Sequence, residues 1–162
     1  MPIIVDGNNL MFALRKAGQD VGRDGVATLL APLASGKERV CVVFDGPAPR
    51  FGNRELAQTN LEILYSFDRS ADELVLERIT ANTAPRRLVV VSTDREIRKA
   101  AQHRGCQDIT SEDFVPLLFK MLERQSRPRV REPSEKREGL SPEEAEKWIK
   151  DLGLGEDAGE DK

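Results

Sequence analysis

Four aspartates follow apolar, strand-like segments of the sequence and together could bind a cation. Asp6 closes the segment IIVD, Asp45 closes VCVVFD, Asp94 follows VVVST, and Asp72 comes soon after LEILYSF. Two carboxylates about 5 Å apart repel each other by roughly 3 kcal/mol at an effective dielectric constant of 20. A cluster of such groups therefore requires a cation, and oxygen ligands favour Mg²⁺ or Mn²⁺. A carboxylate-held cation in turn activates water for attack on a phosphodiester.

Each aspartate also has a purely structural interpretation. Asp6 and Asp45 precede glycines and could be turn residues. Asp72 and Asp94 could be acids at helix starts, where the helix dipole favours negative charge. Four independent structural roles that all fall on one edge of a sheet are a weaker explanation than one cation site.

The elements that must position these aspartates alternate between strands and helices, which predicts a parallel sheet with helices on both faces. The predicted strands cover residues 2–6, 39–45, 61–67, 87–92 and a short edge strand at 107–109. The predicted helices cover residues 10–16, 24–35, a segment capped by Ser70, a segment from Asp94 to about His103, and 111–123, with a turn at 7–9 and a long loop at 46–60. In such sheets ligands bind beyond the carboxyl ends of the strands, where the aspartates are expected.

Other polar residues fall at the same predicted edge. Asn8, Ser92 and Thr93 could orient water or a backbone phosphate. Arginines that could contact phosphate groups are Arg50, Arg54, Arg69 and Arg95, although a single such arginine is more often a solvated surface charge. The one histidine, His103, is expected on a helix surface, so no histidine cluster favours zinc.

Composition limits the range of functions. The chain has 162 residues and a net charge of -3, and residues 1–125 hold 17 Lys and Arg against 17 Asp and Glu. This balance argues against binding nucleic acid by bulk charge, but a cation at the four aspartates would leave a basic surface that suits a phosphate-bearing substrate. Cys41 and Cys106 form no paired or zinc-binding motif. Together with the absence of a signal-like or bilayer-spanning apolar run, this predicts a cytoplasmic protein without a membrane association.

The sequence also predicts a domain organisation. Residues 1–124 form the α/β domain, and residues 125–140 are a charged linker containing Pro and Ser. Residues 141–153 form a short amphipathic helix around Trp148, and residues 154–162 are a disordered acidic tail.

The segments IIVDGNNL, VVFDG, SADELVLERI and VVVSTDREIRKAAQHRGC occur in this order over about residues 2–122. Together they resemble the NYN domain, close to its YacP-like branch, within the PIN-like nuclease superfamily. The resemblance implies a three-layer α/β/α sandwich with a largely parallel central sheet. It also implies an enzyme, a ribonuclease that hydrolyses RNA phosphodiester bonds with Mg²⁺ or Mn²⁺.

The resemblance also assigns roles to individual residues. Asp6, Asp72 and Asp94 match the acids of the metal site, with Asn8 beside them. Asp45 matches the acid of the FDG motif and is expected as an outer member of the site. The turn after the first strand reads DGNN where the YacP-like pattern reads DGYN, so an aromatic residue is absent there.

Alternative functions remain open on the sequence. The main one is a non-catalytic PIN-like module that binds RNA or docks on a ribonucleoprotein. An aspartyl phosphatase is disfavoured because Asn8 stands where a second acid is needed, and a dinucleotide-binding fold is disfavoured because the DGNN turn is not glycine-rich. The expected partner is RNA, structured or ribosome-associated, and the choice between monomer and homodimer is left open.

Overall fold

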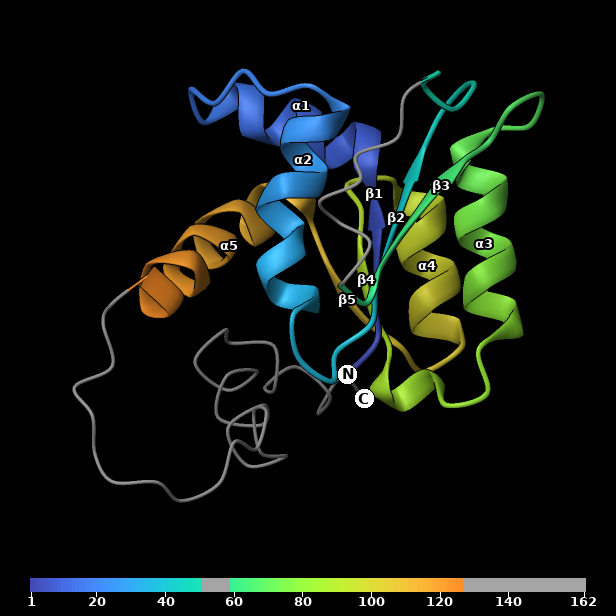
Figure 1. Ribbon diagram of the computed structural model, residues 1–162. Coiled ribbons are helices and arrows are strands. Elements are labelled where there is room, and N and C mark those ends of the chain that lie inside the picture. Colours follow the sequence, from blue (N-terminus) through green and yellow to red (C-terminus); the bar gives the residue numbers. More distant parts are fainter. Residues whose placement is uncertain (51–58, 127–162) are drawn as a thin grey trace, which may run out of the picture. The chain divides into compact units, whose positions relative to one another are not determined.

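The central sheet is fully parallel and has five strands in the order β3-β2-β1-β4-β5 (Figure 1). The computed structural model describes residues 1–50 and 59–126 of the chain. In chain order the strands are β1 (Ile3–Asp6), β2 (Val40–Phe44), β3 (Leu61–Tyr65), β4 (Val89–Val91) and β5 (Gln107–Ile109). The chain builds outward from β1 through β2 to β3 and then returns to place β4 on the other side of β1. The strand order therefore reverses between β1 and β4, the position where open α/β sheets bind their ligands.

Helices cover both faces of the sheet, as the sequence pattern predicts (Figure 1). The helices are α1 (Gly7–Lys16), α2 (Arg23–Leu30), α3 (Ala71–Ala81), α4 (Arg95–His103) and α5 (Ser111–Ser126), together with the short 3-10 helices η1 (Ala31–Ala34) and η3 (Pro85–Arg87). Buried residues of α1, α2 and α5 pack against Val5 and Val42, whereas those of α3 and α4 pack against Ile4 and Val43. Alternate strand residues thus supply two separate apolar layers, which gives the three-layer sandwich.

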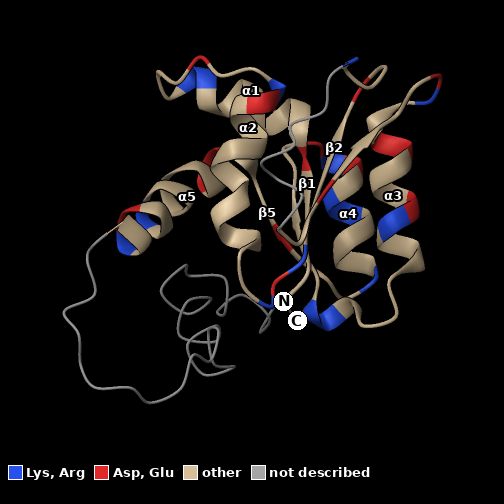
Figure 2. Ribbon diagram, in the orientation of Figure 1, with Lys and Arg blue, Asp and Glu red and all other residues tan. Residues whose placement is uncertain are grey.

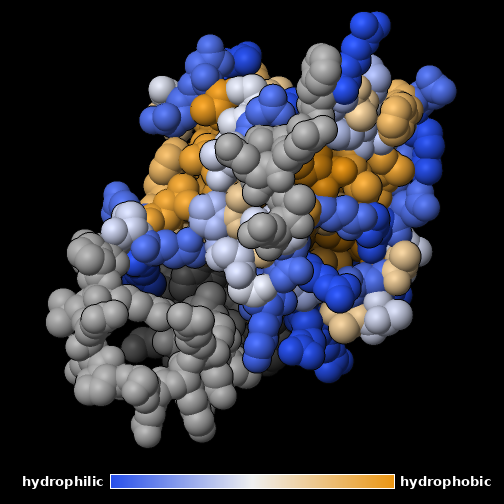
Figure 3. Space-filling model, in the orientation of Figure 1, coloured by the Kyte–Doolittle hydropathy of each residue, from blue (hydrophilic) through white to orange (hydrophobic). Residues whose placement is uncertain are grey.

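The surface reflects this layering. Apolar residues that are only partly covered gather on α5 and beside the edge strand β3, while hydrophilic residues surround them (Figure 3). None of the described helices is long and apolar enough to cross a membrane.

Several predicted boundaries are wrong for identifiable reasons. The predicted turn at 7–9 is the first turn of α1, because the Asp6 carboxylate accepts the Asn9 backbone amide and so caps the helix at Gly7. The predicted helix at 24–35 is divided into α2 and η1 at Pro32, which has no amide hydrogen to donate. The last helix continues to Ser126 with Pro116 inside it.

Some predictions fall outside the described residues. These are the organisation of residues 127–162, including the helix around Trp148, and the part of the loop that holds Arg54. They remain predictions.

Candidate active site

Four junctions between a strand and its following helix deliver the four aspartates to the carboxyl edge of the sheet. Asp6 ends β1 and caps α1, Asp45 directly follows β2, Asp72 is the second residue of α3, and Asp94 caps α4. All the strands are parallel, so these junctions lie on the same side (Figure 2 shows acidic residues at these ends). The sequence therefore predicted correctly where the four residues would lie, and their chemical role remains a prediction.

Asp6 is a buried carboxylate whose oxygens are all engaged. Its side chain is 2% exposed. Its Oδ1 accepts the Asn9 amide at 3.1 Å, and its Oδ2 accepts the Asn9 side-chain amide and the Ser92 hydroxyl, the latter at 3.2 Å. Burial raises the pKa of Asp6, the hydrogen bonds from Asn9 and Ser92 oppose that rise, and the nearby charge of Asp45 adds to it.

Ser92 links Asp6 to the start of α4. Its side chain is fully buried, and besides donating to Asp6 its hydroxyl oxygen accepts the Asp94 backbone amide at 3.0 Å and the Asn9 side-chain amide at 3.3 Å. Asp94 uses Oδ1 to accept two backbone amides of the first turn of α4, at 2.8 and 3.1 Å. The adjacent Arg95 is exposed at the same helix start.

Asp45 joins β2 to α3 and α1. Its Oδ1 accepts the Ala71 amide at 2.7 Å, and its Oδ2 accepts the side-chain amide of Asn8. The guanidinium of Arg23 donates to the Asp45 carbonyl and to the Pro47 carbonyl, the latter at 3.3 Å. Both oxygens of the Asp45 side chain thus accept hydrogen bonds from neighbouring helices, which agrees with an outer position among the four aspartates.

Asp72 gives the clearest sign that the four carboxylates lie close enough to interact electrostatically. It is exposed at the start of α3. Partial desolvation is the largest cause that raises its pKa, followed by the charges of Asp6, Asp94, Asp45 and then Glu96. The three other predicted acids therefore act on Asp72 across elements that are distant in sequence.

Two residues predicted at the site have partners outside the aspartate group. The Thr93 hydroxyl donates to Glu112 at 2.6 Å. Arg69 forms ion pairs with Glu73 at 3.3 Å and Glu77 at 2.9 Å. Exposed pairs of this kind contribute at most about 1 kcal/mol, so a phosphate group can displace them.

Two other residues belong to the site but were not predicted there. Asn9 donates to both Asp6 and Ser92, a role that recognising Asp6 as a helix cap would have suggested, since Asn9 is then in the first turn. Arg23 lies 5.9 Å from the ring centres of both Phe44 and Tyr65 while it holds the Asp45 turn. No local motif indicates this second arrangement.

The four aspartates have the chemistry that a hard cation prefers, but their side chains are not arranged around a common point. Among residues 1–50 and 59–126, no group of three or more His, Cys, Asp or Glu side chains is arranged to hold a metal ion. The donors are nevertheless carboxylates, the ligands that Mg²⁺ and Mn²⁺ prefer. The amides of Asn8 and Asn9 donate to Asp45 and Asp6, so a bound cation would share these carboxylates with the amide donors.

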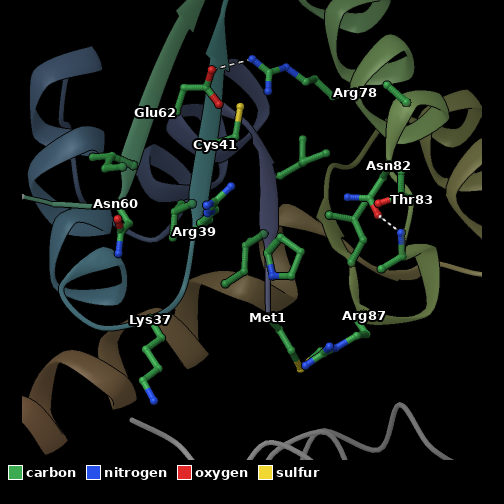
Figure 4. Close-up of a pocket in the computed structure, with 18 of the residues that line it drawn as sticks. Met1, Lys37, Arg39, Cys41, Asn60, Glu62, Arg78, Asn82, Thr83 and Arg87 are labelled. Atoms are coloured by element: carbon green, nitrogen blue, oxygen red, sulfur yellow. Dashed lines mark hydrogen bonds and ion pairs between the residues drawn. The ribbon is translucent and has the colours of Figure 1, made fainter.

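A pocket of about 820 Å³ lies at the opposite edge of the sheet, at the amino ends of the strands (Figure 4). Lys37, Arg39 and Arg87 surround it, and an ion pair between Arg78 and Glu62 at 2.5 Å forms part of its wall. None of the four aspartates lines it. The pocket and the aspartates therefore lie at opposite edges of the sheet. The reversal of strand order favours the carboxyl edge, which carries the aspartates, as the ligand-binding site.

Replacing Ser92 by alanine tests the connection between burial and charge at Asp6. The pKa of Asp6 in the folded protein lies above the usual 3.8, so the unfolded chain loses this proton at a lower pH than the folded protein does. The free energy of unfolding therefore falls as the pH rises through the folded-state pKa. Removing the Ser92 donor further disfavours the ionised form. We expect Ser92→Ala to cost about 1–3 kcal/mol in urea unfolding at pH 7 and less at pH 4, because a larger share of Asp6 is protonated at the lower pH. An equal cost at both values would show that the ionised Asp6 does not depend on Ser92.

The fold and the site place this protein among the all-parallel α/β/α sandwiches that carry acids at the carboxyl ends of their strands. Within that class, the chain belongs to the family of YacP-like NYN domains, whose family model matches residues 3–152. This match confirms the predicted family and, with the sheet, the predicted fold class.

Solved structures agree on the fold. The chain is similar to the crystal structure of Rae1 (YacP) from Bacillus subtilis, with 21% identity, a TM-score of 0.62, and 96% of this chain and 88% of that chain covered. The W164L mutant of the same protein gives 20% identity, a TM-score of 0.60, and 83% and 86% covered. Comparison with curated proteins finds no match.

Proposed function

We propose that this protein is a metal-dependent ribonuclease that hydrolyses RNA phosphodiester bonds at the aspartate group. The observation that carries the proposal is that four β–α junctions bring four aspartates to one edge of the sheet. They are close enough that the charges of Asp6, Asp45 and Asp94 all raise the pKa of Asp72. Such a group is costly to the fold without a cation, and it is suited to phosphate chemistry with one. Family membership supports RNA as the substrate.

Each residue then has a defined role. Asp6, Asp72 and Asp94 hold Mg²⁺ or Mn²⁺, with Asp45 as an outer member that fixes the start of α3. When bound, the ion supplies an activated water and neutralises charge on the phosphate. Ser92 holds Asp6 and the start of α4 in register.

Polar and basic residues around the acids complete the proposed site. Asn8, Arg95, Thr93 and Arg69 contact the phosphate backbone, the last two after releasing their carboxylate partners. With the four aspartates neutralised, the balance of 17 basic and 17 acidic residues in positions 1–125 becomes net positive, which favours a polyanion. We propose structured or ribosome-associated RNA as the partner and the cytoplasm as the compartment.

Cleavage of a structured RNA by the purified protein tests the function. We expect products with Mg²⁺ or Mn²⁺ and none with EDTA. The second candidate is a non-catalytic RNA-binding module, which is favoured by the absence of a ready-made ligand group among the described residues. Retained RNA binding without metal-dependent cleavage would establish this second candidate instead.

Metal binding can be tested without any RNA. A ligand that binds only the folded state stabilises it, by about 2.7 kcal/mol at a concentration of 100 Kd. We therefore expect Mn²⁺ to raise the Tm of the EDTA-treated protein. The increase should be lost in Asp94→Asn but kept in Asp113→Asn, which changes an exposed acid in the first turn of α5 instead. An unchanged Tm of the wild-type protein at millimolar Mn²⁺ would contradict the metal site.

A further inference from the structure

Phe67 combines two features that disfavour the folded state. Its side chain is 63% exposed, although it is a large aromatic group. Its backbone φ is 54°, and no other non-glycine residue in the described ranges has a positive φ. For a bulky residue this left-handed conformation is strained, and such strain persists where the surrounding structure enforces it.

The surrounding hydrogen bonds hold Phe67 at the edge that carries the aspartates. Its backbone amide donates to the Gly46 carbonyl at 3.0 Å, and the Gly46 amide donates to the hydroxyl of the buried Ser66, also at 3.0 Å. Gly46 directly follows Asp45, whose carboxylate caps the amide of Ala71 at the start of α3. The loop from β3 to α3 is therefore tied to the Asp45 turn on both sides of Phe67, and the ring is left in solvent.

The other large exposed apolar side chain in the described ranges is different. Phe12 on α1 is 56% exposed, but the ammonium group of Lys16 lies 5.0 Å from its ring centre. Its backbone is part of a regular helix. Phe12 therefore provides a matched control for the exposure of an aromatic ring without the strain and without the position beside Asp45.

We propose that Phe67 stacks on an unpaired nucleobase of the RNA whose phosphate is held at the aspartates. RNA as the ligand rests on the proposed function. An aromatic face binds any base by stacking, and proteins read unpaired nucleotides in this way. The hydrogen bonds to Gly46 hold the backbone at Phe67 and Ser66 with the ring exposed before RNA arrives, so binding costs less ordering of the loop.

Binding of a labelled stem–loop RNA to the wild-type protein, with Ca²⁺ in place of Mg²⁺, tests this role. Ca²⁺ also binds carboxylate oxygens and so neutralises the aspartates, but it activates water less than Mg²⁺ does, so the RNA stays intact. We expect Phe67→Ala to weaken binding by about tenfold or more, the loss typical of one base–aromatic stack. Phe67→Tyr should retain the affinity because it keeps the flat ring, and Phe12→Ala should leave it unchanged.

A glycine variant separates a binding role from a structural one. Because glycine adopts positive φ without strain, Phe67→Gly should raise the Tm while weakening RNA binding as much as Phe67→Ala does. Unchanged affinity in Phe67→Ala, or a lower Tm in Phe67→Gly, would overturn the inference.

The same assays distinguish failure of this inference from failure of the proposed function. If the wild-type protein cleaves RNA and Phe67→Ala binds normally, only the stacking role is wrong. If the wild-type protein binds but never cleaves RNA and Phe67→Ala binds weakly, the stacking role stands and the ribonuclease proposal fails. If the wild-type protein does not bind RNA at all, both are wrong.

Discussion

Asp94→Asn is expected to reduce metal-dependent RNA cleavage by at least about a thousandfold, which corresponds to about 4 kcal/mol of lost transition-state stabilisation. The loss follows from removing one of the charges that hold the cation, since an amide is a weaker ligand for Mg²⁺ than a carboxylate. Initial rates with Mg²⁺ or Mn²⁺ in excess measure the effect.

The fold should survive this substitution. Asp94 caps α4 by accepting two backbone amides through Oδ1, and asparagine is an equally good helix cap. Asp6→Asn should also abolish cleavage, but it is a less clean test because the amide of Asn9 donates to the oxygen that would become an amide nitrogen. Asp113→Asn provides the control and should cleave RNA normally. Normal cleavage in both Asp94→Asn and Asp6→Asn would remove the aspartate group from the mechanism.

Gly7→Ala is expected to destabilise the domain by about 2–4 kcal/mol, the range of severe overpacking in a core. A Cβ at Gly7 would lie 2.4 Å from Cε1 of Phe44 and 2.8 Å from the carbonyl oxygen of Val43. The Phe44 ring is fully buried and the second contact is backbone, so neither can move away at low cost. Helix propensity alone predicts the opposite sign, a stabilisation of up to about 1 kcal/mol.

Urea unfolding at neutral pH measures this difference directly. Gly36→Ala is the matched control, because a Cβ there meets nothing within 4 Å and its backbone φ is not positive. It should change the free energy of unfolding by less than about 0.5 kcal/mol. If Gly7→Ala were as stable as the wild type, α1 would be free to move away from β2, and the contact with Phe44 and Val43 would not fix the placement of Asp6 and Asn8.

The sequence predicted the strands, their alternation with helices and the edge where the aspartates lie. These features depend on local signals, since VCVVF or VVV followed by a polar turn indicates a buried parallel strand by itself. Predicted strand ends differed from the observed ones by one or two residues; β3, for example, ends at Tyr65 and not at residue 67.

The hydrogen-bonding within the site could not be predicted in the same way. The contact between Ser92 and Asp6 joins residues 86 positions apart and exists because β4 lies beside β1. A single sequence contains no signal for that strand order. The role of Asn9 was missed for a related reason, because the apolar spacing that begins at Leu10 conceals the first turn of α1.

The central position of β1 also determines when the site can exist during synthesis. β1 pairs with β2 on one side and β4 on the other, and both follow it in the chain. A nascent chain that ends before β4 leaves one side of β1 open and Asp6 without Ser92. A ribonuclease built in this order would acquire its activity only when most of the domain had left the ribosome, so incomplete chains would not damage RNA.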